Sequence, residues 1–395
     1  MLRNKYGGFN ITNNSRTELK VVTTFEGRFD LLRTAIESFE KRHPYVKVII
    51  DVAHKDMLSN RVKEIEPDIL EIKSQDYPSF VHNKLVEDLQ PYLDKDNFNI
   101  DDFYGSMIKL TKVKNHLAAI PSLAVMPAVY YNKTLFDKED IPYPEEGWAW
   151  DEFEDIARKL TKKGENGRIT QYGCFVPTDD LYYLEAFALS NGGSFLSPNG
   201  KSSIGYLDSQ NTIEAIERFV GLFRKQRLSP YRIRTLDFPK VAMHCMTSVL
   251  VPFIKQNQKN IGVVGLPKFK KEVSFIAVRG FGISSKSRHK DLAWEFLSEF
   301  ILPYGSIGKE WTKWQMSTSK SLAKESGQKD DPIWQPFYRA LNHIQESSFL
   351  KNGKWEELRP HYNEKILSMI KDERSVQEII KEWARAVQNK LESES

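Results

Sequence analysis

Two predicted turns carry polar side chains that could bind a polar ligand. Glu26 and Arg28 directly follow a predicted strand at 19–25, and Gln75 and Asp76 follow another at 67–72. Carboxylate, guanidinium and amide groups form directed hydrogen bonds, and parallel α/β sheets bind ligands at the carboxyl ends of their strands. The turns therefore predict a binding site, although a solvated loop is the ordinary alternative at 75–76.

Two aromatic residues flank these turns, Phe25 before the first and Tyr77 after the second. A ring at such a position can stack on a ligand, but aromatic side chains are more often buried. For Phe25 we keep both alternatives open, ligand contact and core packing.

Motifs for catalysis are absent or incomplete. Gly193 and Gly200 enclose six residues, whereas a P-loop needs four, and the segment RGFGIS at 279–284 lacks the third glycine of a dinucleotide fingerprint. Neither H-E-x-x-H nor G-x-S-x-G occurs. The pair Asp179 and Asp180 could suggest a glycosidase, but adjacent acids are usually solvated or cap a helix. We therefore expect no enzyme, no cofactor and no metal site.

Composition favours a globular protein of two domains. The chain has 395 residues, a net charge of +4 without any basic block, and two cysteines, Cys174 and Cys245, without metal-ligand spacing. These features argue against nucleic-acid binding, and whether the cysteines are bridged stays open. No apolar run is long enough to cross a bilayer. Residues 1–17 are polar and lack the apolar core of a signal peptide, so we expect a flexible leader on a cytosolic, mature or truncated chain.

The elements that position the turns follow from hydrophobic periodicity. Strands at 19–25 and 46–52 enclose a helix that ends at His43-Pro44, which predicts a parallel α/β unit. Further strands are expected at 173–177, 241–243, 261–266 and 273–284. Apolar residues at helical spacing predict helices near 153–160, 181–189, 213–223, 292–300 and 376–387, with Ser209 as an N-cap.

The segment 119–136, AIPSLAVMPAVYYNKTLF, is apolar but contains Pro121 and Pro127. Proline can neither donate to a sheet ladder nor continue a helix. We interpret the segment as a passage between two lobes; a core strand with an edge proline is the alternative.

Several motifs in chain order resemble one family. They are SFEKRHPYVKVII, PDILEI with LVEDLQPYL, AIPSLAVMPAVYYNKTLFDKEDIPYP with WAWDEFEDIARKLT, SNGGSFLSPNG, IEAIERFVGLFRKQRLSP, KVAMHCMTSVLVPF, IGVVGLP, and RGFGISSKSRHKDLAWEFL. Their order is similar to that of family-1 extracellular solute-binding proteins, the maltose-binding-like sugar receptors of bacterial ABC importers. The resemblance covers nearly the whole chain, from residue 18 to residue 391.

The resemblance implies a two-lobed periplasmic-binding-protein-like (type II) α/β fold, in which each lobe is a mixed sheet flanked by helices. The ligand is expected in the cleft between the lobes. It implies lobe one at 18–124 plus 265–314 and lobe two at 125–264 plus 315–395. Passages between the lobes are expected near 123–127, 261–266 and 314–319.

The resemblance also implies site residues in both lobes. The first lobe would contribute the turns described above, and the remaining candidates are Asp180, Tyr182, Tyr183, His244, Ser248, Arg279, Phe281, Trp314 and Tyr338. Trp311 and Trp334 are further stacking candidates, although we expect only one or two of Trp311, Trp314, Trp334 and Tyr338 to touch ligand. Arg279 and Phe281 replace a glycine pair common in the family, and Val249 stands where the family often has an aromatic residue, which argues against a long linear maltodextrin.

The implied function is a non-catalytic receptor that binds a mono- or oligosaccharide and delivers it to the permease of an ABC importer by hinge closure. The alternative is a sugar-sensing protein that signals to a membrane histidine kinase, and a glycosidase is a weaker one. We expect a monomer in the periplasm or on the extracellular face of the cytoplasmic membrane, where the native form would be a lipoprotein.

Overall fold

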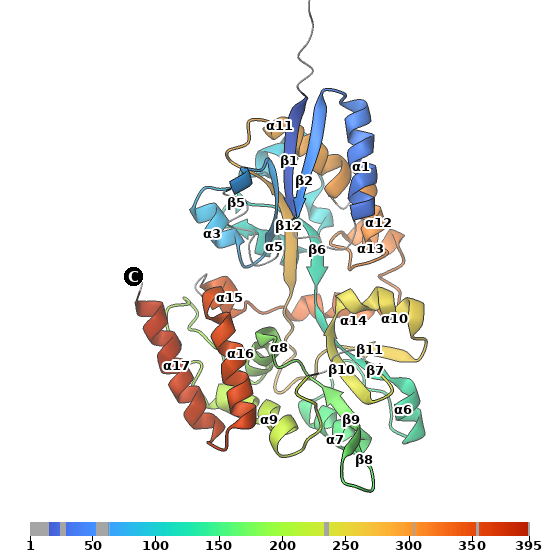
Figure 1. Cartoon of the computed structure of the whole chain (residues 1–395), viewed down its shortest axis with the longest axis vertical. Helices are drawn as coiled ribbons and strands as arrows, with labels where there is room; N and C mark the ends of the chain where they lie inside the picture. The colour runs from blue at the N-terminus through green and yellow to red at the C-terminus, as the bar shows by residue number, and fades with distance from the viewer. Residues whose placement is uncertain are drawn as a thin grey trace, which may run out of the picture.

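Two five-stranded sheets, each covered by helices, form two lobes that lie one above the other along the long axis of the molecule (Figure 1). The computed structural model describes residues 16–23, 29–52, 62, 64–232, 237–302, 305–352 and 355–393. The α/β architecture with two sheets flanked by helices, expected from the sequence, is confirmed.

The first sheet has the strand order β2-β1-β3-β12-β6. Strands β1 and β2 are parallel, from Thr17 opposite Val46 to Thr23 opposite Val52, and α1 connects them as the periodicity predicts. The early elements are β1 (Thr17–Thr23), α1 (Phe29–Arg42), β2 (Val46–Val52), β3 (Ile69–Lys73), α3 (Tyr77–His82), α4 (Gln90–Lys95), η1 (Ile100–Asp102), α5 (Gly105–Thr111), β4 (Lys112–Val113), β5 (His116–Leu117) and β6 (Ile120–Val125).

The second sheet has the order β11-β7-β10-β9-β8, in which β7 runs antiparallel to both of its neighbours. Helices α7, α8 and α9 pack on it and form one large apolar core with α16 and α17. Its elements are β7 (Pro127–Asn132), α6 (Lys133–Lys138), α7 (Trp150–Leu160), β8 (Lys162–Lys163), β9 (Ile169–Phe175), α8 (Leu181–Ser190), α9 (Gln210–Arg224), β10 (Val241–Thr247), η2 (Ser248–Leu250), α10 (Val251–Asn257) and β11 (Ile261–Val264).

The remaining chain returns to the first sheet and then to the second lobe. Its elements are β12 (Ala277–Ile283), α11 (Lys290–Phe296), the π-helical η3 (Leu297–Ile301), α12 (Ser306–Trp311), α13 (Lys320–Glu325), α14 (Gln335–Ala340), η4 (Leu341–His343), α15 (Ser348–Lys351), α16 (Trp355–Lys371) and α17 (Val376–Glu392). Strand β12 is shorter than the strand expected at 273–284.

The proline-broken segment consists of two strands in different sheets. Strand β6 is the last strand of the first sheet and β7 belongs to the second, so the chain passes between the sheets at the buried Met126. Pro121 lies in an edge strand, where a missing N–H is tolerated.

The second passage joins β11 to β12. Residues 265–276 pack on the second lobe before β12 begins: Lys268 forms a parallel bridge with Ala149, and Phe275 belongs to the core of the second sheet. The domain limits stay a prediction, and these contacts favour a second limit near residue 276 rather than 265.

A shared apolar core lies where the lobes meet. It contains Ala124 of β6, Tyr130 of β7, Val278 of β12 and Phe337 of α14, all buried. The third connection lies beside it, because Met316 forms an antiparallel bridge with Ala124.

Candidate functional site

The first-lobe turn at 75–76 lies where the sequence predicts it, after β3. Gln75 and Asp76 are half-buried. Ser74 fixes the turn to β12, because its backbone N donates to Val278 O at 2.8 Å and its Oγ accepts from Val278 N at 3.3 Å. Phe25, Glu26 and Arg28 lie outside the described residues, so the first predicted turn stays a prediction.

Tyr77 is fully buried, and its hydroxyl donates to Ile72 O at 3.1 Å. Burial raises the pKa of Tyr77 well above its usual value, with a smaller contribution from the carboxylate of Glu71. Tyr77 is therefore a packing residue and offers no surface to a ligand in this conformation.

Charged side chains from neighbouring strands meet at one end of the first sheet. Arg279 of β12 lies with its Nη1 3.6 Å from Glu71 Oε1 of β3, and Thr23 of β1 donates to the other oxygen of Glu71 at 2.8 Å. Glu71 and Thr23 are buried, whereas the Arg279 side chain is 31% exposed. Glu71 orients a partly exposed guanidinium, a role the sequence analysis missed although an acid within an apolar strand is itself a signal.

Glycines allow this arrangement on β12. A Cβ at Gly280 would lie 2.5 Å from Ile120 O, and one at Gly282 would lie 2.4 Å from Ala118 O. Both positions therefore require glycine, Gly280 for β6 and Gly282 for the segment before β6 to approach β12 closely. Phe281 between them is buried and stacks on Trp311, with ring centroids 6.4 Å apart. The side chains of Phe281 and Trp311 thus belong to the core.

The second lobe presents a polar and aromatic group at the start of α8. Asp180 caps the helix by accepting from Tyr182 N at 3.0 Å, and Tyr182 stacks on Phe275 with centroids 5.1 Å apart and planes 28° apart. Asp180 and Tyr182 are half-buried. Phe275 was not predicted as a site residue, because only the tertiary structure brings the second passage against α8.

Tyr183 contacts the same phenylalanine ring as Tyr182 but points into the core. It is 1% exposed and meets Phe275 edge-on at 5.4 Å. Burial raises the pKa of Tyr183 well above its usual value. Because adjacent helical residues point about 100° apart, only one of the two tyrosines remains partly accessible.

His244 and Ser248 are both buried. His244 packs on Phe238 and Phe175, with centroids at 4.5 and 6.2 Å, and burial lowers the pKa of its imidazole to about 4. Ser248 Oγ accepts from Met126 N at 3.2 Å, and Ser248 N donates to Met126 O at 2.8 Å. His244 is thus a neutral core residue near pH 7, and Ser248 ties β10 to the first passage.

The aromatic candidates beyond the third connection are mostly buried as well. Trp334 and Tyr338 are 2% and 5% exposed, and the Tyr338 hydroxyl lies 2.5 Å from Gln328 Oε1 and accepts from Ser317 N at 3.2 Å. Trp314 is half-buried. Of these candidates, Trp314 keeps the most accessible ring.

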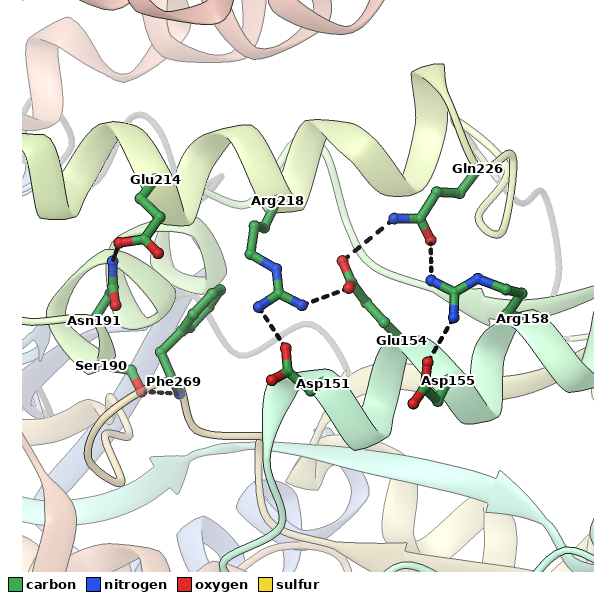
Figure 2. Close-up of polar contacts among 10 residues, drawn as sticks. All are labelled: Asp151, Glu154, Asp155, Arg158, Ser190, Asn191, Glu214, Arg218, Gln226 and Phe269. Carbon is green, nitrogen blue, oxygen red and sulfur yellow. Dashed lines mark hydrogen bonds and ion pairs between the residues drawn. The ribbon is translucent and has the colours of Figure 1, made fainter.

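A network of polar contacts anchors the segment that leads to Phe275 (Figure 2). Arg218 of α9 pairs with Asp151 and Glu154 of α7, each at 2.5 Å, and its guanidinium lies 5.6 Å from the ring centroid of Phe269. Phe269 N also donates to Ser190 Oγ at 2.9 Å at the end of α8. The second passage is thereby held on the second lobe, which fixes the position of Phe275.

A cavity of about 470 Å³ lies between this passage and η4. Four of the side chains that line it form two contacts, Arg339 with Glu146 at 3.7 Å and His343 with Glu272 at 3.2 Å, and Lys268 lines it as well. Burial raises the pKa of Glu146 above its usual value, partly offset by Arg339. None of the predicted site residues lines this cavity.

The described part of the chain was also compared with the requirements of a metal site, a disulfide and a membrane span. No group of three or more His, Cys, Asp or Glu side chains there is arranged to hold a metal ion. Cys174 and Cys245 are both free and buried. Over the same residues, no helix combines the length and the apolar character needed to cross a membrane.

Comparison with known proteins gives relatives with the same two-lobed architecture. An ABC substrate-binding protein from Listeria monocytogenes in complex with cycloalternan has a TM-score of 0.79 at 19% identity, covering 95% of this chain and 98% of that one. The sugar-binding protein MalE of Xanthomonas citri has a TM-score of 0.80 at 15% identity, covering 95% and 97%. These likenesses establish the fold.

Sequence comparison gives a match over part of the chain and a family. The galactooligosaccharide-binding protein of Bacillus subtilis is 24% identical over 291 residues, which is 67% of this chain and 64% of that protein. Residues 26–303 match the family described as bacterial extracellular solute-binding protein. Since this match spans well over half of the sequence, the chain belongs to the bacterial extracellular solute-binding protein family.

Proposed function

We propose that this chain is a non-catalytic carbohydrate receptor that binds a mono- or oligosaccharide between its lobes and delivers it to an ABC importer by hinge closure. The carrying observation is the pair of groups flanking the second passage. Asp180, Tyr182 and Phe275 lie on the second lobe, and Arg279 with Glu71 on the first. Phe275 and Arg279 are four residues apart, so their Cα atoms are at most about 14 Å from each other.

The chemistry of the two groups suits a sugar. A pyranose ring has apolar C–H faces that stack on aromatic rings, and a rim of hydroxyls that bond to planar polar side chains. Tyr182 is a half-buried ring, and Asp180 and Arg279 are charged groups whose hydrogen bonds are stronger than neutral ones. The names of the relatives, which bind galactooligosaccharides or cycloalternan, support the same ligand class.

The site we propose is smaller than the set of candidates from the sequence. It comprises Asp180, Tyr182, Arg279, Gln75, Asp76 and Trp314, which are half-buried. Phe275 and Glu71 are buried and would position Tyr182 and Arg279 rather than touch the ligand. Phe25, Glu26 and Arg28 stay predicted contacts. Tyr183, His244, Ser248, Phe281 and Tyr338 are assigned to packing because each is at most 5% exposed.

Membership of an extracellular family favours a location in the periplasm or on the outer face of the cytoplasmic membrane. We propose that the native form is anchored there, is a monomer and works with the permease subunits of an importer. We also propose residues 1–17 as a leader, lobe one at 18–124 plus 265–314, and lobe two at 125–264 plus 315–395, with the second limit shifted towards 276 by the contacts of Phe275.

Calorimetry against a panel of mono-, di- and oligosaccharides tests this function, with amino acids and short peptides as a second panel. We expect saturable sugar binding that weakens about tenfold or more in Arg279→Ala and in Asp180→Asn, because each loses a charged hydrogen bond. Asparagine retains the capping function of Asp180, so the second variant should fold normally. Arg168→Ala, an exposed arginine on β9's preceding turn, is the control. Binding to the second panel and to no sugar would reject the carbohydrate proposal.

A further inference from the structure

The cavity of about 470 Å³ beside the second passage lies outside the proposed sugar site, because none of the residues of that site lines it. Three segments far apart in the chain form its walls: the loop before α7, the second passage between 265 and 274, and the end of α14 with η4. Figure 1 shows α14 at the level where the two lobes meet. The volume is in the range of about 300–1,000 Å³ that small-molecule sites occupy.

Two side chains of opposite charge line this cavity without meeting each other. Lys268 and Glu272 are both half-buried. Glu272 contacts His343 through Oε2, whereas its Oε1 has no hydrogen-bond or ion-pair partner among the residues that the structure describes. The ammonium group of Lys268 likewise has no partner in the described part of the chain. Each group has lost part of its hydration without compensation, so each can gain from a ligand of the opposite charge.

Gly147 keeps the space between these two groups open. A Cβ at this position would lie 3.2 Å from Glu272 Oε1 and 3.7 Å from Lys268 Nζ, so both charged groups border the same point. The backbone φ of +79° at Gly147 also favours glycine. Any other residue would place a side chain between the carboxylate and the ammonium group. The chain therefore leaves an opening between opposite charges at this point.

A second loosely held pair lies in the same cavity. Arg339 Nη1 and Glu146 Oε1 are 3.7 Å apart, which is longer than a hydrogen bond. Apart from His343, the cavity thus has two carboxylates and two cations in its walls. A ligand with a single charge would satisfy groups of one sign and leave those of the other sign without a partner. A zwitterion can satisfy both signs at once.

The rest of the wall is partly apolar. Leu266, Val273 and Ala340 line the cavity beside the charged groups. We propose that the cavity binds an aliphatic α-amino acid, whose carboxylate contacts Lys268 and whose ammonium group contacts Glu272. An α-amino acid carries both charges on one carbon atom, which suits two groups that border a single point. Its side chain packs against Leu266 and Val273.

The backbone holds this site in place without a ligand. Lys268 N donates to Trp148 O at 3.0 Å, and Lys268 O accepts from Trp150 N at 2.8 Å. Ser274 N donates to His343 O at 3.0 Å, which joins the second passage to η4. A ligand therefore orders little of the chain when it binds, and the entropic cost stays low. Because these bonds use backbone atoms, substitutions of the Lys268 side chain leave them intact.

Calorimetry on the whole chain with leucine tests the site. Two analogues keep the side chain of leucine: 3-methylbutylamine lacks the carboxylate and 4-methylpentanoate lacks the ammonium group. We expect saturable binding of leucine and at least about tenfold weaker binding of each analogue, because each loses a charged hydrogen bond. Lys268→Met and Glu272→Gln should each weaken leucine binding by a similar factor. Lys271→Met is the matched control, since Lys271 is an exposed lysine of the same passage that does not line the cavity.

The other outcomes overturn the inference. They are a wild-type protein that does not bind leucine, analogues that bind as well as leucine, and unchanged leucine binding in both Lys268→Met and Glu272→Gln. Leucine binding that is lost in Arg279→Ala but kept in Lys268→Met would place the amino acid between the lobes, and so would competition with a bound sugar. Sugar binding itself should be unchanged in Lys268→Met, so a failure of this site and a failure of the proposed function remain distinguishable. Urea midpoints of all variants establish that each is folded.

Discussion

Glu185 of α8 is a carboxyl group enclosed by protein on every side. It is 2% exposed, and its Oε1 accepts hydrogen bonds from Ser348 N at 2.7 Å and Ser348 Oγ at 2.5 Å. The described residues contain no ion pair to it. Burial raises the pKa of Glu185 to about 7, and the hydrogen bonds from Ser348 and the charge of Lys351 offset this only in part. Glu185 thereby connects α8, the helix that Asp180 caps, to Ser348 at the start of α15.

The buried environment of Glu185 predicts a specific pH dependence of the free energy of unfolding. The pKa of Glu185 is higher in the folded protein than in the unfolded chain, so protonation favours folding. The protonated Glu185 stabilises the folded state fully below about pH 4.5, and this stabilisation is lost as the pH rises to about 7. The loss in the free energy of unfolding is at most about 3 kcal/mol. Urea unfolding at pH 5 and pH 7.5 should show a smaller loss of stability with rising pH in Glu185→Gln than in wild type. Glu214→Gln, at an exposed carboxylate, should keep the wild-type dependence; an unchanged dependence in Glu185→Gln would contradict the assignment.

At the scale of elements, the second passage is held by side chains of three helices. Arg218 connects α9 to α7 through Asp151 and Glu154 and covers Phe269, while Ser190 at the end of α8 binds the backbone of the same segment. Gln226 donates weakly to the other oxygen of Glu154 at 3.5 Å. Removal of Arg218 would leave the largely buried Glu154 carboxylate without its cation.

Arg218→Ala should therefore lower the stability of the protein by about 1–3 kcal/mol, less than for a fully buried pair because Arg218 is 31% exposed. The urea midpoint reports the loss. Arg158→Ala is the matched control on α7: its pair with Asp155 at 2.6 Å is exposed, so a loss below about 1 kcal/mol is expected. Equal losses in the two variants would show that the Arg218 network contributes no more than a surface ion pair.

At the scale of the whole molecule, the two lobes share apolar core. Phe337 of α14 is buried in an apolar cluster that also contains residues from strands of both sheets. The ring centroids of Tyr104 in the first lobe and Tyr338 of α14 are 5.5 Å apart. Lys329 lies over both tyrosine rings, at 5.8 and 5.3 Å. Contacts of this kind couple the stability of one lobe to that of the other.

Hydrogen exchange measured by mass spectrometry can test this coupling. Phe337→Ala, which removes a ring from the shared core at a cost of about 3–5 kcal/mol, should increase exchange in both β6 and β7. Phe39→Ala, in the first lobe's own core and outside the shared one, should increase exchange mainly in the first lobe and less in β7 than Phe337→Ala does. Faster exchange confined to the second lobe in Phe337→Ala would mean that the lobes unfold independently.

The sequence alone determined most of the local structure, because helices and strands depend on short-range periodicity and on capping residues. Ser209 caps α9 and Asp180 caps α8, α1 ends at Arg42 before His43-Pro44, and β2 spans the predicted residues 46–52. The two-lobed fold was implied by the resemblance of motifs in chain order to a known family, and only the first passage between the lobes was inferred from the residues themselves, at Pro121 and Pro127.

The tertiary structure decided which of the candidate side chains remain accessible. Tyr182 and Tyr183 are neighbours in sequence, yet only Tyr182 stays half-exposed, and His244 and Tyr338 became core residues. The pairs Glu71 with Arg279 and Tyr182 with Phe275 join residues far apart in the chain. Local patterns do not specify such pairs, because burial and long-range contact depend on how the sheets and passages pack together.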